Sequence, residues 1–258
     1  MKLQLLPSTF EKGGAASKRQ HLTTLVLDDK VAFDAGTLAM ACSEAQRASI
    51  RDIVISHAHL DHIAGLPLFI DDLFATLTEP VRIHATAEVI EVLEDNIFNW
   101  QIYPRFSELT NEFGPVMEYV EFRPGDSFRV CHLNVVPIEV DHKVQSCGFV
   151  ISDDNGTIAV TGDTAPTDAF WSGVNKLPSV RAVLIECAFP NELAELASLS
   201  FHLTPDGLAK ELRKLERSDC EIFVTNIKPA YCTETVLQIN RLNIQGLKVL
   251  EVGLTYEW

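Results

Sequence analysis

The segment 54–66, VISHAHLDHIAGL, places three histidines and an aspartate within six positions, directly after an apolar run. Alternate side chains of an extended segment point to the same side, so His57, His59 and Asp61 can converge while His62 begins the next turn. Imidazole nitrogens and carboxylate oxygens are ligands for zinc, manganese and iron. Because buried polar groups without partners are costly, this density favours a metal site over a solvated polar loop. The segment has enough donors to serve two adjacent cations.

Two further candidate ligands follow other apolar runs. His142 comes after NVVPI, and Asp163 comes after TIAV. Gly162, beside the aspartate, allows the backbone to approach closely. Taken alone, each would be interpreted as a surface histidine or a turn residue. Taken with HAHLDH, both are expected to be ligands of the same metal site.

The elements that position these residues are predicted from periodicity and turn signals. Strands or β-rich runs are expected at 2–6, 22–27, 30–36, 52–56, 81–85, 117–122, 128–140, 148–163, 180–189, 221–226 and 247–252. Helices are expected at 37–48, 66–77, 86–98, 204–217 and 233–243. Two β-rich halves, each finished by helices, predict two packed sheets with helices outside. The chain shows no internal repeat or linker, and 1–258 is expected to form a single domain.

Composition excludes several function classes. Acidic residues outnumber basic ones, with a net charge of −15, so no nucleic-acid partner is expected, because binding a polyanion needs clustered Lys and Arg. Six cysteines occur without a C-x-x-C pair and are interpreted as free thiols in a reducing compartment. The sequence offers no signal-peptide pattern and no apolar run of about 18 residues, which predicts no membrane partner and a cytoplasmic location.

The chain resembles the metallo-β-lactamase superfamily, whose H-x-H-x-D-H motif is matched by His57, His59, Asp61 and His62. More narrowly, it resembles the class II 3′,5′-cyclic-nucleotide phosphodiesterases, whose signature is matched by HAHLDHIAG. Further similar stretches are DNIFNWQIYPRFSEL, IECAFPNEL, SFHLTPDGLAKEL and VTNIKPAY, so the likeness runs from about residue 5 to 232. The superfamily motif is highly specific for a metal site, whereas these stretches are moderately specific.

The resemblance implies an α/β (α+β) fold, a four-layer αββα sandwich, with two divalent metal ions at one edge. Zinc is the first expectation, with manganese and iron as alternatives. By the superfamily's pattern, His57, His59 and His142 would hold the first ion, Asp61 and His62 the second, and Asp163 would bridge the two. His202, in SFHLTP, matches a position that contacts phosphate and protonates the leaving oxygen in related phosphodiesterases.

One departure from that pattern concerns the second ion. Its last ligand is usually the histidine of a T-H-I motif, but the matching stretch FVTNIKPAY carries Asn226. An amide oxygen is a weaker and harder donor than imidazole. The second site is therefore labile, selective for manganese or iron, completed by His202, or defective. Asn226 is kept as a candidate ligand.

The implied activity is hydrolysis of a small anionic substrate, a 3′,5′-cyclic nucleotide (cAMP or cGMP), to a 5′-nucleoside monophosphate. Two cations would lower the pKa of a bridging water and clamp the phosphodiester oxygens. His202, Asp61 and Asp163 are the expected catalytic residues. Lys228 is either a phosphate contact or a solvated lysine. The aromatic residues between 98 and 106 either stack on a purine or pack a helix end; they are Phe98, Trp100, Tyr103 and Phe106.

Several alternatives stay open. Thioester hydrolases and β-lactamases share such a metal cluster, which does not by itself select among esters and amides. A tRNA 3′-processing endonuclease is disfavoured, because the stretch between His142 and Asp163 holds no basic arm and only Lys143. A metal-binding sensor or redox module with a degenerate second site is the non-hydrolytic alternative. A homodimer is also open, the role of His21 is unassigned, and two remote histidines, His84 and His132, are interpreted as structural.

Overall fold

The computed structural model describes residues 1–258 and contains two mixed seven-stranded β-sheets. In spatial order, the strands of the first sheet are β16 (Thr255–Glu257), β1 (Lys2–Leu5), β2 (Leu25–Leu27), β3 (Val31–Phe33), β4 (Asp52–Val54), β5 (Val81–Ala85) and β8 (Met117–Glu121). Those of the second sheet are β15 (Leu247–Val249), β14 (Glu221–Thr225), β13 (Ala182–Glu186), β12 (Thr157–Val160), β11 (Cys147–Ser152), β10 (Leu133–Glu139) and β9 (Phe128–Val130). A separate two-stranded hairpin pairs β6 (Thr110–Asn111) with β7 (Gly114–Pro115).

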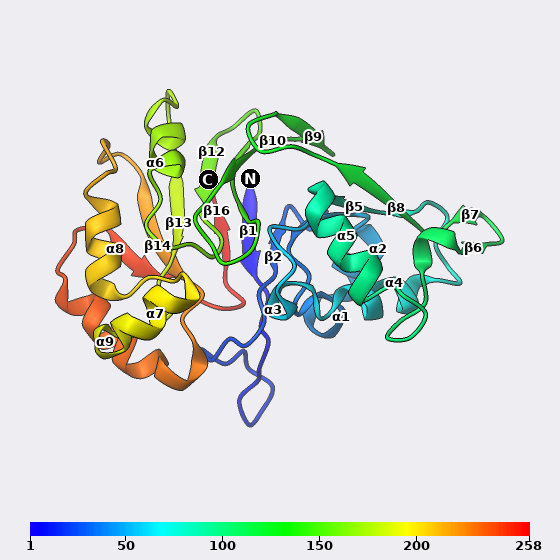
Figure 1. Cartoon of the computed structure of the whole chain (residues 1–258), viewed down its shortest axis with the longest axis horizontal. Helices are drawn as coiled ribbons and strands as arrows, with labels where there is room; N and C mark the ends of the chain where they lie inside the picture. Colours follow the sequence, from blue (N-terminus) through cyan, green and yellow to red (C-terminus); the bar gives the residue numbers. More distant parts are fainter.

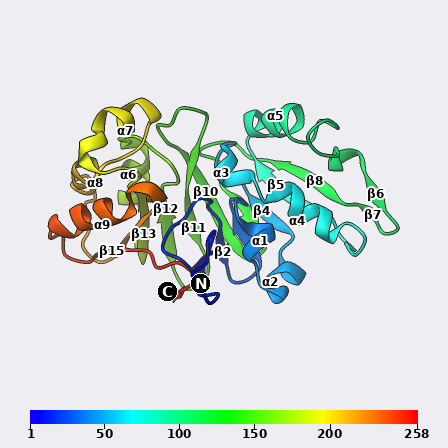
Figure 2. The ribbon, with the colours of Figure 1, turned by 90° about the horizontal axis from the view of Figure 1, so that it is seen from below.

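Helices lie on both outer sides of the paired sheets (Figures 1 and 2). Those of the first half are α1 (Leu38–Ala41), α2 (Glu44–Ser49), α3 (Leu60–Ile63), α4 (Leu66–Leu73) and α5 (Ala87–Asn96). Those of the second half are α6 (Asp168–Asn175), α7 (Ala194–Ser200), α8 (Pro205–Leu212) and α9 (Cys232–Arg241). Short 3₁₀ turns occupy Phe106–Glu108, Asn191–Leu193 and Pro229–Tyr231. The predicted αββα sandwich is confirmed.

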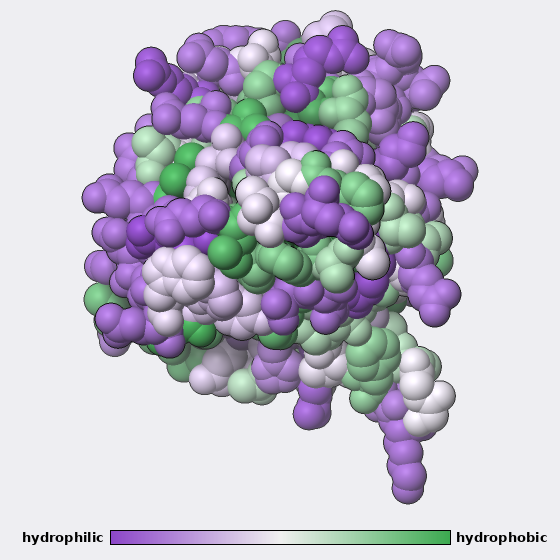
Figure 3. All heavy atoms as spheres, turned by 90° about the vertical axis from the view of Figure 1, so that its right-hand side faces the viewer, coloured by the Kyte–Doolittle hydropathy of each residue, from purple (hydrophilic) through white to green (hydrophobic).

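Three hydrophobic clusters hold these layers together. Alternation along each strand sends Val54 and Leu184 into the space between the sheets, whereas Ile53 and Val183 pack under the outer helices. Burying an aliphatic side chain of this size stabilises the fold by about 1.5–3 kcal/mol. None of the helices is both long and apolar enough to cross a membrane. On the face in Figure 3, purple hydrophilic residues are interspersed with smaller green hydrophobic areas.

The structure divides the helix predicted at 37–48 into α1 and α2. Cys42 takes an extended conformation, and Ser43 begins α2 with a capping box in which Ser43 and Gln46 each accept a hydrogen bond from the other's backbone N–H. This reciprocal cap restarts the helix at a defined residue. The predicted periodicity was right, but the S-x-x-Q signal within it marked a boundary.

The elements that the sequence prediction missed include α6, α7 and β16. Gly173 lies inside α6 and weakens its helical propensity, yet a Cβ there would meet Cδ1 of Ile138 at 2.6 Å. The glycine therefore lets α6 pack closely on β10. Strand β16 pairs with β1 from the other end of the chain, and the amino group of Met1 donates a hydrogen bond to the carbonyl of Trp258. Such long-range pairing has no local signal.

Strand direction brings six chain segments to one edge of the sandwich. β3 runs parallel to β4, and β12, β13 and β14 are mutually parallel. β10 has the direction of β12, because each is antiparallel to β11. The residues that follow these strands include most of the candidate ligands, so the topology explains how distant segments meet.

Candidate metal centre

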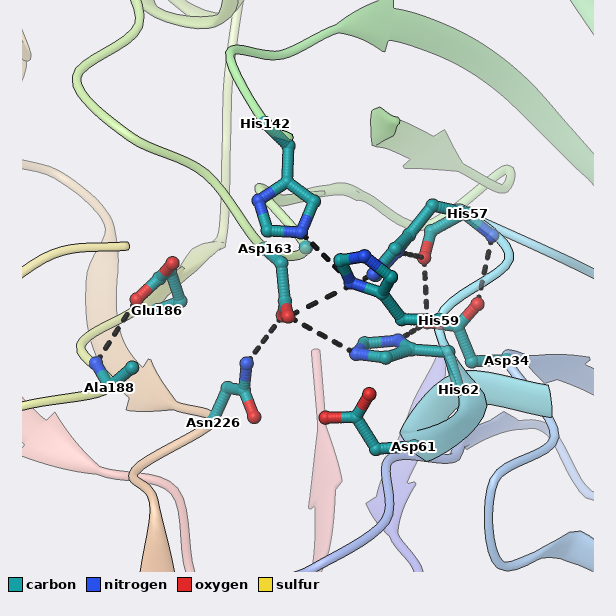
Figure 4. A network of polar contacts seen from close by, with 12 residues as sticks. Asp34, His57, His59, Asp61, His62, His142, Asp163, Glu186, Ala188 and Asn226 are labelled. Atoms are coloured by element: carbon teal, nitrogen blue, oxygen red, sulfur yellow. Dashed lines mark hydrogen bonds and ion pairs between the residues drawn. The ribbon is translucent and has the colours of Figure 1, made fainter. Parts of the chain in front are cut away.

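The first group of candidate ligands consists of His57, His59 and His142. Their ring nitrogens lie within 4.8 Å of one another. Nε2 of His142 is 3.2 Å from Nδ1 of His59, and the two rings meet nearly edge to face (Figure 4). His57 and His59 come from the turn after β4, and His142 comes from the loop after β10. The structure therefore brings together the three histidines that the sequence predicted for a first ion.

A second group shares His57 and adds His62 and Asp163. Oδ2 of Asp163 lies 3.4 Å from Nε2 of His62 and 3.9 Å from Nε2 of His57. All three side chains are almost fully buried. His62 lies on α3, where the chain turns from extended to helical, and its ring lies beside that of His57, facing Asp163 (Figure 4).

The chemistry of this group fits a divalent cation. Three buried atoms have no hydrogen-bond partner: Nε2 of His57, Nε2 of His62 and Oδ2 of Asp163. Leaving a buried polar atom unpaired costs about 1–3 kcal/mol, and here three such atoms point toward one another. A cation accepts lone pairs from all three at once, which would remove that cost. The residues present therefore fit a bound metal.

Burial sets the protonation of the first group. Burial, with the charges of neighbouring histidines, holds the pKa of His57 well below its usual value. Burial also lowers the pKa of His59 and of His142. Neutral imidazole is the form that binds a metal, so these three rings are held in the ligand-competent state.

Asp34 orients two of the histidines and was not predicted from the sequence. Its Oδ2 accepts a hydrogen bond from Nδ1 of His62 at 2.6 Å and another from Oγ of Ser56 at 2.9 Å. Oγ of Ser56 in turn lies 3.0 Å from Nδ1 of His57. One carboxylate behind the ligands therefore fixes one ring directly and a second through a hydroxyl. Its only local signal is a polar residue directly after the apolar run of β3.

Asp61 lies outside the close groups of potential ligands. Its Oδ2 accepts a hydrogen bond from Nζ of Lys228 at 3.1 Å. Burial alone would lower the pKa of Lys228, but the charges of Asp61 and Asp163 outweigh it and raise that pKa. Asn226, with a left-handed φ of 53°, donates from Nδ2 to Oδ1 of Asp163. Figure 4 shows its amide nitrogen turned toward Asp163.

His202 lies beside the first group, because it forms a close cluster with His142 and Asp163. Its Nδ1 donates to Oε1 of Glu186 at 2.7 Å. Burial alone would lower the pKa of His202, but the hydrogen bond and charge of Glu186 outweigh it and raise that pKa. Glu186 is fully buried at the end of β13 and also accepts three backbone N–H groups, from Thr164, Ala188 and Leu203.

A family model described as the beta-lactamase superfamily domain matches residues 30–220. The chain belongs to the metallo-β-lactamase superfamily. It is 30% identical over 210 residues to a Yersinia pestis protein named "Probable 3′,5′-cyclic-nucleotide phosphodiesterase", a match that covers 72% of this chain and 59% of that protein. It is 33% identical over 202 residues to an Aliivibrio fischeri 3′,5′-cyclic-nucleotide phosphodiesterase, with coverage of 69% and 59%. The matched region thus spans about three fifths of each relative's length.

The fold of this metallo-β-lactamase superfamily member is also that of a solved structure, unliganded yeast PDE1. The two superpose with a TM-score of 0.76 at 18% identity, over 98% of each chain. At that identity the likeness shows the fold alone.

Other residues that the sequence analysis named lie away from the candidate metal ligands. Phe98 and Phe106 are fully buried in the hydrophobic core of the first half, so of the two alternatives given for them the structure supports core packing. Tyr103 packs against Phe106, and Trp100 is exposed. The structural role predicted for two histidines agrees with their contacts: His84 pairs with Asp52, and His132 pairs with Asp28. His21 is exposed.

Proposed function

We propose that this protein is a metal-dependent phosphodiesterase that hydrolyses 3′,5′-cyclic nucleotides to 5′-nucleoside monophosphates. The observation that carries the proposal is the convergence of the unpartnered buried atoms of His57, His62 and Asp163 beside the histidine group. The names of the two bacterial relatives support the substrate class. A bound divalent cation would supply Lewis acidity toward the phosphodiester and lower the pKa of a water.

The residues of this chain would divide the remaining work. His57, His59, His62, His142 and Asp163 would hold the metal. Four of these five residues are buried and His59 is half-buried; with Asp34 behind two of the rings, this keeps the donors in place before the substrate arrives. The cyclic phosphodiester carries one negative charge, and Lys228 offers a positive side chain at the same edge. The ammonium would hold a phosphate oxygen in exchange for part of its contact with Asp61.

His202 would donate the proton that the departing ribose 3′ oxygen needs. Nδ1 of this histidine donates a hydrogen bond to Glu186, which raises the pKa of His202 and so favours the ring form whose Nε2–H could be transferred. Glu186 itself is fixed by backbone N–H groups, so the pair behaves as one rigid unit. A general acid in this position contributes about 10²–10⁴-fold to the rate.

The test is turnover of cyclic AMP and cyclic GMP by metal-loaded protein, with product identified by chromatography. We expect a 5′-monophosphate from the native chain and near-complete loss of turnover in His59→Ala and Asp163→Ala. His132→Ala removes a histidine outside the cluster and should keep native turnover. Metal-loaded protein that hydrolyses neither substrate, or an Asp163→Ala variant with native turnover, would overturn the proposal. Hydrolysis of a thioester or β-lactam, but not of a cyclic nucleotide, would show that the protein is a hydrolase of another substrate class.

A further inference from the structure

The surroundings of Asp61 determine how many cations this site can hold. Asp61 and Lys228 form an ion pair in which their side chains are only 27% and 28% exposed. A protonated lysine has no lone pair, so it cannot ligate a metal. A second cation bound to Asp61 would have to lie beside this ammonium or displace it. The oxygen of Asp61 closest to Lys228 is thus already neutralised by a charge that belongs to the chain.

Asn226 also hinders the binding of a second cation, because it contacts Asp163. Its Nδ2 donates to Oδ1 of Asp163, while Oδ2 of that carboxylate remains unpartnered and faces His57 and His62. Reversing the amide would set its oxygen against the carboxylate oxygen, so the carboxylate fixes the orientation. An N–H group is a donor and offers no lone pair. If Asp163 bridged two ions, Oδ1 would have to bind the second one. That oxygen already accepts the hydrogen bond from Asn226.

Donor atoms remain free on the other side of Asp163. The unpartnered nitrogens of His57 and His62 and Oδ2 of Asp163 face one position, beside the rings of His59 and His142. We propose that this protein binds a single divalent cation there, and that the ammonium of Lys228 takes the place of a second cation. This replaces the expectation of two ions that the superfamily pattern gave.

The inference rests on the proposed function only for the contact between Lys228 and a phosphodiester substrate. The number of bound ions does not depend on that substrate. Asp61 then holds and neutralises the lysine when no substrate is present. Asn226 keeps Oδ1 of Asp163 occupied, so that a single oxygen of this carboxylate remains for the cation.

The experiment counts ions on the full-length protein. Metal-free protein is titrated with Co²⁺, visible absorption follows ligand binding, and native mass spectrometry with Zn²⁺ gives the number of ions per chain. We expect saturation at one equivalent for the native chain. The double variant Asn226→His/Lys228→Gln introduces the imidazole of the superfamily pattern and removes the ammonium. We expect it to bind two equivalents of metal. Lys176→Gln, at an exposed lysine away from the site, should remain at one.

Two tightly bound ions in the native chain would overturn the inference. The native count stands by itself if the double variant does not fold. One ion without cyclic-nucleotide turnover would leave this inference intact and overturn the proposed function. Two ions with cyclic-nucleotide turnover would overturn this inference and leave the proposed function intact, so the two failures are distinguishable.

Discussion

Nδ1 of His62 lies 2.6 Å from Oδ2 of Asp34, and this contact fixes which nitrogen of the ring faces the metal position. Asp34 comes from the end of β3 and His62 from α3, so one contact ties the ligand-bearing turn to the sheet edge. The same carboxylate accepts hydrogen bonds from both the N–H and the hydroxyl of Ser56. Asp34 is thus a positioning residue that would act through His62 and Ser56.

Replacing Asp34 by Asn keeps the side-chain size but turns one of these two acceptor oxygens into a donor. We expect metal affinity to fall about 10–100-fold, as for other residues that orient a ligating histidine. Competition with a chromophoric chelator measures this directly. Asp126→Asn alters an exposed carboxylate elsewhere and should keep the native affinity. Unchanged metal affinity in Asp34→Asn would show that the ring of His62 is fixed by other contacts.

The general-acid role of His202 predicts a dependence on the leaving group. His202→Ala should lower kcat for a cyclic nucleotide about 10²–10⁴-fold. The loss should be much smaller for a p-nitrophenyl phosphodiester, because p-nitrophenolate leaves without a proton. The number of bound ions should not change, which separates proton donation from metal binding. Equal losses for both substrates would argue against proton donation by His202.

The sequence predicted the parts of this structure that have local signals. The dense HAHLDH motif follows a strand, and His142 and Asp163 follow others, so sheet topology alone brings them to one edge. Asp34 and Glu186 were missed because each is a single acidic residue in or after an apolar run, and its role depends on a partner far along the chain. The Lys228–Asp61 contact was missed for the same reason.

The aromatic residues at 98–106 show a different limit. An aromatic cluster near a helix end has the same sequence pattern whether it packs a core or contacts a ligand. Phe98 and Phe106 are buried beneath the helices of the first half, whereas Trp100 is exposed. Burial depends on which helix covers the segment, and that packing is a property of the folded chain.

The closeness of Gly36 to α3 predicts that an added methyl group would disturb the site. A Cβ at Gly36 would lie 2.0 Å from the backbone oxygen of Asp61 and 2.8 Å from the backbone nitrogen of Thr23. Gly36→Ala must therefore displace the turn that carries Asp61 and His62. We expect a loss of about 1–3 kcal/mol in the free energy of unfolding, with weaker metal binding.

Gly207→Ala is the matched control for this substitution. Its added Cβ would make only ordinary contacts, the nearest at 3.4 Å. Gly207 lies in α8, where alanine has a higher helix propensity than glycine. We expect this variant to keep metal affinity and to be as stable as the native chain or more so. Urea unfolding with a parallel metal titration measures both quantities. Native-like stability and affinity in Gly36→Ala would show that the turn moves without cost.

A pH-dependent contribution to stability is expected from Asp52, which lies in β4 and supports the strand that leads to the ligands. Burial alone would raise the pKa of Asp52, but hydrogen bonds from Arg82, His84 and Cys131 outweigh it and hold that pKa well below its usual value. The ionised carboxylate is thus favoured by folding. Its contribution is fully present above the unfolded-state pKa of about 3.9 and is lost as the pH falls toward the lower folded-state pKa.

Asp52→Asn should therefore lower the free energy of unfolding by about 2 kcal/mol near pH 7, because it removes hydrogen bonds to a charged group. The difference from the native chain should stay constant down to about pH 5 and shrink below about pH 4. Urea unfolding of both proteins across this range measures the difference. Asp126→Asn, which changes an exposed carboxylate, should show little difference at any pH. A difference for Asp52→Asn that grew as the pH fell would mean that the protonated form of Asp52 is the one favoured by folding.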